Sequence, residues 1–252
     1  MLENIDVARE VAKDEYKAEK DELELKLAAL QRKAKDYNIP VIILFEGWDA
    51  AGKGTLINKL ILPLDPRGFT VTSTLAPTEE ERLRPFLWRF WTKIPPAGRI
   101  AIFDRSWYRR VWDERVDKKG KVADIFRAYE DIRSFERQLT DGGYVILKFF
   151  LHITKKEQKK RFRKLRRNEN TAWRVTKEDM RRHKQYDAYL AASNDMLVNT
   201  DNDYAPWTVV EAHDRRFATL KIFNTVLNAL EMRVAEAERR QEEKPLKREK
   251  IS

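Results

Sequence analysis

The sequence contains no cysteine, which excludes disulfide-stapled folds, thiolate metal sites and cysteine nucleophiles. Its only three histidines, His152, His183 and His213, stand singly along the chain, which argues against a histidine-rich zinc site. No apolar run approaches the ~20 residues that a membrane-spanning helix needs. The N-terminus mixes both charges and lacks the apolar segment of a secretory signal. We therefore expect a cytoplasmic protein without a membrane partner.

Positive charge is concentrated in one part of the chain. Lys and Arg number 51 against 41 Asp and Glu in 252 residues, a net charge of +10. Residues 155–184 carry 14 Lys and Arg against 4 Asp and Glu, an excess equal to that of the whole chain. Such a stretch predicts either a polyanionic partner or an ordinary solvated face. Its place between the fourth and fifth predicted strands favours a lid that closes over phosphates.

Short apolar runs alternate with helical patterns, which is typical of a doubly wound parallel α/β sheet. Residues 41–45 are apolar throughout, as a strand buried on both faces must be. Helices are predicted at 55–62, 79–91 and 123–139. The aromatic residues of 86–91 are expected to pack in the core, and stacking on a base is the alternative. The other predicted strands are 69–75, 99–103, 144–151 and 208–211, which makes five.

The pattern divides the chain into three segments. Residues 1–38 predict an amphipathic helix, because leucines recur at helical spacing between residues 23 and 30. Residues 39–230 form the predicted sheet domain, which includes the lid. Residues 231–252 are charged and have no strong apolar stripe, so we expect a frayed tail.

The strongest motif directly follows the first predicted strand. Residues 47–54 fit the pattern G-x-x-x-x-G-K and precede a predicted helix, which is the context of a phosphate-binding loop. Its backbone N–H groups and the helix N-terminus attract a phosphate, and Lys53 can reach terminal phosphate oxygens. A plain glycine-rich turn is the alternative. The predicted loop residues are Gly47, Ala50, Ala51, Gly52, Lys53, Gly54 and Thr55.

The residue after the loop lysine departs from the common pattern. A Ser or Thr hydroxyl usually binds Mg²⁺ at that position, but this chain has Gly54. Asp49 lies inside the loop, and a carboxylate is a hard oxygen ligand. We therefore expect Asp49 to take over part of the metal binding, with Thr55 as the weaker candidate.

A second candidate group follows the third predicted strand. Asp104 comes 51 residues after Lys53, and Arg105 and Arg110 follow it. Because ligands of doubly wound sheets bind at the carboxyl ends of the strands, Asp104 is expected to face the loop. There it would share the metal ion or polarise the attacking phosphate. A helix cap is the alternative role for an aspartate at this place.

On these residues the chain resembles the polyphosphate kinase 2 family, from about residue 23 to about residue 230. The loop FEGWDAAGKG at 45–54, the run FDRSWY at 103–108 and the lid segment EQKKRF at 157–162 carry the resemblance. It implies a P-loop kinase-like core with a helical basic lid and Mg²⁺ or Mn²⁺ as cofactor. By the same resemblance, the residues that bind phosphate or metal are Asp49, Lys53, Asp104, Arg105, Arg110 and Arg161, with Asp49 and Asp104 on the metal.

Several shorter stretches, among them 87–91 and 98–103, resemble the polyphosphate:AMP phosphotransferase branch of this family. Four places depart from the family's pattern, two of them at Asn168-Glu169, where Asp-Pro is common, and at Thr219, where an Arg is expected. Arg109 stands where members usually have Asn or Gly, and Leu165 stands where many carry a lid arginine. We expect Arg67, Arg161, Arg163, Arg166 and Arg167 to bind polyphosphate, with Arg163, Arg166 and Arg167 supplying from neighbouring turns the lid charge that is missing at Leu165.

The sequence therefore predicts a reversible phosphotransferase that moves the terminal phosphoryl group of inorganic polyphosphate to AMP, and more slowly to ADP. An acceptor that is already anionic needs positioning and charge neutralisation rather than a strong base. An ATP-dependent nucleoside monophosphate kinase shares the loop and a basic lid, but one ATP needs far less positive charge. A non-catalytic nucleic-acid-binding module is the third hypothesis. We expect a homo-oligomer without a stable nucleic-acid partner.

Overall fold

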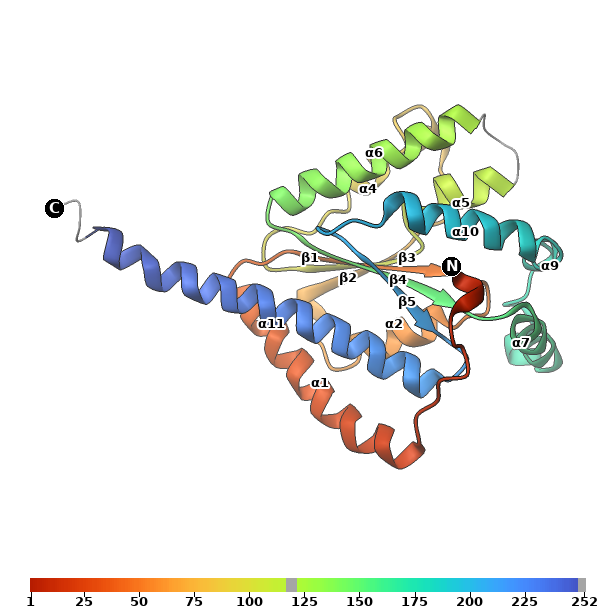
Figure 1. Ribbon diagram of the computed structural model, residues 1–252, viewed down its shortest axis with the longest axis horizontal. Helices are drawn as coiled ribbons and strands as arrows, with labels where there is room; N and C mark the ends of the chain where they lie inside the picture. The colour runs from red at the N-terminus through yellow and green to blue at the C-terminus, as the bar shows by residue number, and fades with distance from the viewer. Residues whose placement is uncertain (117–121, 249–252) are drawn as a thin grey trace.

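Five parallel strands form one sheet at the centre of the molecule (Figure 1). The structure, a computed structural model, describes residues 1–116 and 122–248. The strand order is β2-β3-β1-β4-β5, which confirms the predicted doubly wound parallel sheet, and each predicted strand is found to within two residues at either end. The strands are β1 (Val41–Gly47), β2 (Phe69–Ser73), β3 (Ile100–Asp104), β4 (Val145–His152) and β5 (Trp207–Glu211).

Helices cover both faces of the sheet (Figure 1). One face carries α1 (Lys13–Asp36), α2 (Lys53–Ile61) and α11 (Arg215–Arg248). The other carries α4 (Trp88–Trp91), α5 (Arg109–Val116), α6 (Val122–Asp141) and α10 (Tyr186–Thr200). Because both faces are covered, every residue of the central strand β1 is buried. No helix within the described ranges is both long and apolar enough to cross a membrane.

The basic segment 155–184 forms three helices beyond the carboxyl ends of the strands. They are α7 (Lys155–Arg167), α8 (Glu169–Ala172) and α9 (Lys177–Lys184). Thr154 caps α7 by accepting a hydrogen bond from the backbone N–H of Glu157, and Thr176 begins α9 with a capping box. Figure 1 places α7 and α9 at the end of the sheet to which the strand arrows point. The sequence therefore brings the basic segment to the end of the sheet where ligands bind.

The single helix predicted at 79–91 is wrong. The structure has two short helices, α3 (Glu79–Arg82) and α4, with a break at Pro85 between them. Proline lacks the N–H that a helix interior needs and disfavours helical backbone at the residue before it. The break turns the aromatic segment that follows across the end of β3, where Phe90 packs edge-on against Phe103 and Trp107.

The boundary expected at residue 230 lies within a helix. Helix α11 continues to Arg248, so most of the expected tail is helical, and residues 249–252 lie outside the described part. Val226, Leu230 and Val234 are buried and recur every four residues, which extends the apolar stripe past the expected boundary. The amphipathic helix expected over residues 1–38 is shorter than predicted, because α1 begins only at Lys13. The short 3₁₀ helix η1 (Leu2–Asn4) precedes it.

Candidate active site

The loop between β1 and α2 has the backbone of a phosphate-binding loop. Gly47, Ala50 and Gly52 all have positive φ angles, of 111°, 62° and 107°. A side chain at Gly47 would collide with the backbone of Leu151, so the close approach of β4 also requires glycine there. Gly52 is the N-cap of α2 and offers no side-chain cap, which leaves the N–H groups of the first helical turn for a ligand.

Lys53 is the first residue of α2 and lies across this loop. Its side-chain Nζ donates hydrogen bonds to the carbonyl oxygens of Gly47 at 2.7 Å and Trp48 at 3.0 Å. Burial and the neighbouring Arg105 lower the pKa of Lys53, while Asp49 and other carboxylates oppose them. The lysine is thus held against the loop, and its contact with phosphate oxygens stays a prediction.

Asp49 and Arg105 meet above the loop. The Oδ1 atom of Asp49 lies 2.8 Å from Nη2 of Arg105, and its Oδ2 atom lies 3.3 Å from Nη1 of Arg182 on α9. Burial alone would raise the pKa of Asp49, but the charges of Lys53, Arg105 and Arg182 hold it below its ordinary value. Asp49 therefore stays ionised and links the loop to the turn after β3 and to the lid.

Asp104 ends β3 beside the loop. Its Oδ1 atom is buried and has no hydrogen-bond partner among the described residues. A buried carboxylate oxygen without a partner is costly unless a ligand satisfies it. Within the described ranges no cluster of three or more His, Cys, Asp or Glu could hold a metal ion by itself. Mg²⁺, however, is commonly held by one or two carboxylates together with substrate phosphates and water, so Asp104 and Asp49 fit this ion.

Arg161 of the lid is directed into the loop. Its guanidinium donates to the carbonyl oxygens of Ala50 and Ala51 on one side, and to those of Ala212 and His213 on the other, over 2.6–3.1 Å. It also pairs with Glu157 at 2.8 Å. These contacts pair the guanidinium with backbone oxygens, so Arg161 clamps the loop, and its contact with a phosphate stays a prediction.

The remaining lid predictions divide into two groups. Arg163, Arg166 and Arg167 are exposed on α7, beyond the clamped end of that helix. Arg67 lies far from the site, because it precedes β2 and so sits at the amino end of the sheet, where it pairs with Asp65 at 2.9 Å. Because the strands all point toward the loop, the structure does not bring Arg67 together with the other residues predicted to bind phosphate, and its assignment to polyphosphate stays a prediction.

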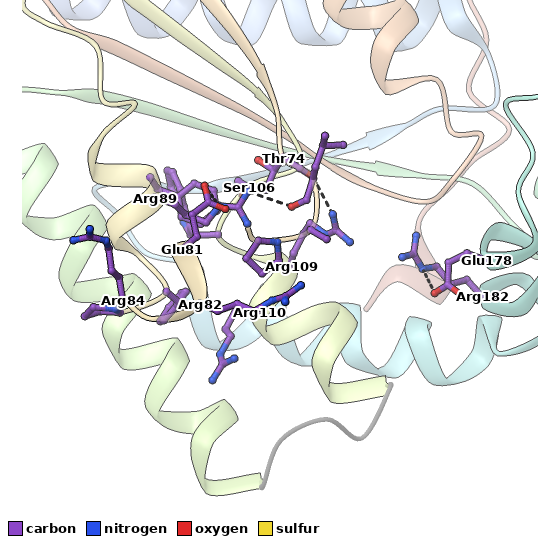
Figure 2. Close-up of a pocket in the computed structure, with 17 residues that line it drawn as sticks. Thr74, Glu81, Arg82, Arg84, Arg89, Ser106, Arg109, Arg110, Glu178 and Arg182 are labelled. Atoms are coloured by element: carbon purple, nitrogen blue, oxygen red, sulfur yellow. Dashed lines mark hydrogen bonds and ion pairs between the residues drawn. The ribbon is translucent and has the colours of Figure 1, made fainter. Parts of the chain in front are cut away.

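A cavity of about 700 Å³ opens beside the turn after β3 (Figure 2). It lies between the segment after β2, the helices α3 and α4, the start of α5, and α9. Arg109 donates a hydrogen bond to the carbonyl oxygen of Thr74 at 2.9 Å, and Arg110 lies 5.7 Å from the centre of the Phe86 ring. We call this the arginine cavity; the arginines that line it are Arg82, Arg84, Arg89, Arg109, Arg110 and Arg182.

Sequence reasoning missed most of this cavity. Arg182 reaches it from α9, 133 residues from its partner Asp49 in the chain, and no local pattern marks such a pairing. Phe86 and Phe90, for which core packing was favoured over stacking on a base, also line its wall. The charged run at 79–84, with three glutamates and two arginines, was one local signal. There the Glu81 carboxylate takes part in the capping box of α3 and lies 3.4 Å from Arg89.

The sheet, the phosphate-binding loop and the helical lid together define a P-loop kinase-like protein. The family model of polyphosphate kinase 2 (PPK2) matches residues 10–238, and the chain belongs to this family.

Relatives of known name agree with this assignment. The polyphosphate:AMP phosphotransferase of Pseudomonas aeruginosa is 41% identical over 231 residues, which are 92% of this chain but only 47% of that protein. The NDP-polyphosphate phosphotransferase 3 of Ruegeria pomeroyi is 34% identical and matches over 89% of this chain and 74% of its own length. The crystal structure of polyphosphate kinase 2 from Arthrobacter aurescens TC1 superposes with a TM-score of 0.88 at 31% identity, covering 91% of this chain and 84% of that one.

Proposed function

We propose that this chain transfers the terminal phosphoryl group of inorganic polyphosphate to a nucleotide, with AMP as the favoured acceptor. One observation carries the proposal: the phosphate-binding loop, with Asp49, Lys53, Asp104 and Arg105 gathered at its mouth, opens beside an arginine-lined cavity of nucleotide size. The name of the Pseudomonas aeruginosa relative supports AMP as acceptor.

The chain's own groups account for the transfer. The loop N–H groups and the N-terminus of α2 hold the phosphoryl group, and Lys53 and Arg105 neutralise the charge that spreads over its oxygens. The acceptor phosphate enters from the arginine cavity, where Arg110 orients it for in-line attack. When bound through Asp49 and Asp104, Mg²⁺ supplies further charge neutralisation. The rest of the polymer lies along the exposed arginines of α7.

The donor is tested by offering polyphosphate and ATP separately, each with AMP and Mg²⁺. The proposal expects ADP from polyphosphate in the absence of ATP. Formation of ADP only in the presence of ATP would instead support a nucleoside monophosphate kinase. Retained nucleic-acid binding without any turnover would support the non-catalytic hypothesis.

Replacing Arg163, Arg166 and Arg167 together by alanine is expected to raise KM for polyphosphate by about tenfold and to leave KM for AMP nearly unchanged. These side chains are exposed, so their attraction for the polymer is screened over ~8–10 Å by physiological salt. The increase should therefore shrink as ionic strength rises. Initial rates at several salt concentrations measure this, and an equal effect on both substrates would contradict the role given to α7.

AMP is expected to have a higher kcat/KM than ADP with the same polymer. Arg109 adds a cation to the cavity, which by itself favours the acceptor with more phosphate, but its bond to Thr74 holds it against the cavity wall. A preference for ADP above tenfold, about 1.4 kcal/mol at the transition state, would overturn this expectation. The variant Arg109→Asn shows whether that arginine sets the preference, since the guanidinium is then lost while the rest of the cavity remains.

A further inference from the structure

Glu46 is a buried carboxyl group at the end of β1 to which the reaction outlined above gives no role. It is 1% exposed and lies between the phosphate-binding loop and the turn after β3. Its Oε1 atom accepts two hydrogen bonds from Ser106, from the backbone N–H at 2.6 Å and from the hydroxyl at 2.7 Å. Ser106 is itself fully buried. This pair of short bonds ties β1 to the residue that directly follows Arg105.

The turn that Glu46 holds has an unfavourable backbone conformation. Arg105 has a φ angle of 62°, in the left-handed region that a bulky side chain rarely adopts. The conformation persists because neighbouring groups determine it. The N–H of Arg105 donates to the carbonyl oxygen of Phe45 at 3.0 Å, the Thr74 hydroxyl donates to the carbonyl oxygen of Arg105 at 2.7 Å, and Glu46 fixes the next peptide.

The backbone conformation decides where the Arg105 guanidinium lies. In the observed turn it reaches Asp49 at 2.8 Å, over the mouth of the loop. A change to right-handed backbone at Arg105 would redirect the side chain away from Asp49. We propose that Glu46 is a positioning residue, which acts through Ser106 to hold Arg105 where the transferred phosphoryl group binds. The proposal rests on the phosphotransferase function given above.

Hydrogen-bond acceptance, more than negative charge, is what Glu46 supplies to Ser106. Burial raises the pKa of Glu46 to about 7, although the Ser106 hydrogen bonds and the charge of Lys53 act in the opposite direction. Its second oxygen, Oε2, has no hydrogen-bond partner among the described residues. A glutamine can therefore keep both bonds to Ser106 with its amide oxygen. Its amide nitrogen then replaces Oε2, which makes no hydrogen bond among the described residues.

The experiment compares Glu46→Gln with Glu46→Met, which has a similar length but no acceptor oxygen. With polyphosphate and AMP, E46M is expected to lower kcat about 100-fold and to change neither KM more than about twofold, since displaced catalytic groups cost about this much. E46Q should stay within about fivefold of the wild-type kcat. Equal losses in E46Q and E46M, or a full rate in E46M, would overturn the proposal.

A control separates positioning from a general loss of stability. Gln31 is also buried, and its side chain holds the backbone of Asp65 through bonds of 2.7 and 3.1 Å at the other end of the sheet. Q31M should lower the melting temperature without a selective loss of kcat. If E46M does not fold, S106A takes its place, because it removes the hydroxyl bond to Glu46 and keeps the backbone bond. S106A should lower kcat about threefold at constant KM. An unchanged kcat in S106A would overturn the proposal.

A double-mutant cycle tests the route through Arg105. If Glu46 acts by placing that side chain, E46M should cost little further rate once Arg105 is alanine, because residues that act as a unit are strongly non-additive. If the loss of kcat in the double variant equals the product of the two single losses, Glu46 does not act through Arg105. Failure of the proposed function itself is distinguishable, because the wild-type chain would then show no polyphosphate-dependent turnover.

Discussion

Asp104→Asn is expected to lower kcat by about 10²–10³-fold, the loss that follows removal of one charged contact to a transition state. The folded state should be unaffected, because the Oδ1 atom of Asp104 is buried without a hydrogen-bond partner among the described residues. An amide in its place cannot supply the negative charge that Mg²⁺ and a phosphoryl group require together. Steady-state kinetics with polyphosphate and AMP, combined with thermal unfolding, measure both effects.

Asp65→Asn is the matched control for this prediction. Asp65 accepts hydrogen bonds from the backbone and side chain of Arg67, which lower its pKa to about 2, and it lies at the end of the sheet away from the loop. Its substitution should leave kcat unchanged. A near-normal rate and an unchanged Mg²⁺ dependence in D104N would show that Asp104 does not act on metal or phosphate.

Lys148→Met is expected to destabilise the protein by about 3–5 kcal/mol, the cost of leaving the partner of a buried ion pair alone. Lys148 and Glu136 lie 2.8 Å apart, and both side chains are fully buried. Lys148 also donates to the hydroxyl of Tyr108 at 3.0 Å and the carbonyl oxygen of Thr200 at 2.9 Å. Urea unfolding of the two proteins gives the difference in the free energy of unfolding.

Two further variants define the cause of that loss. The double variant K148M/E136L should recover only part of the stability. It leaves no buried charge, but the Trp107 and Tyr108 side chains, which donate to Glu136 at 3.0 and 2.7 Å, lose their acceptor. The exposed pair of Lys26 and Glu22 is the control, and K26M should cost less than ~1 kcal/mol. A loss of that small size in K148M, or no recovery in the double variant, would contradict the role given to the buried pair.

The sheet could be predicted from the sequence because its strands are buried on both faces. A continuous apolar run such as β1 is typical of a strand that is buried on both faces, and the loop glycines mark its end. The helices were less predictable. The proline at residue 85 is itself a signal for the break between α3 and α4, but the aromatic spacing favoured one helix. The continuation of α11 depends on its packing against α1, which the local charge composition does not reveal.

The sequence could predict the site residues that come directly after a strand, but not those that reach the site from elsewhere in the chain. Asp49, Lys53 and Asp104 lie where the carboxyl ends of β1 and β3 place them. The direction of a long side chain depends on contacts distant in sequence, so the four carbonyl oxygens that Arg161 binds could not be predicted. The location of Arg67, by contrast, could have been predicted from the sequence. It precedes β2, and in a parallel sheet this places it at the end opposite the loop.

The central claim is that phosphate passes from the polymer to a nucleotide without ATP. The most direct measurement incubates the purified chain with polyphosphate labelled by ³²P, unlabelled AMP and Mg²⁺, and separates the products by charge. The account predicts labelled ADP in the wild-type protein and almost none in D104N. Absence of labelled ADP, or its appearance only after ATP is added, would contradict the account.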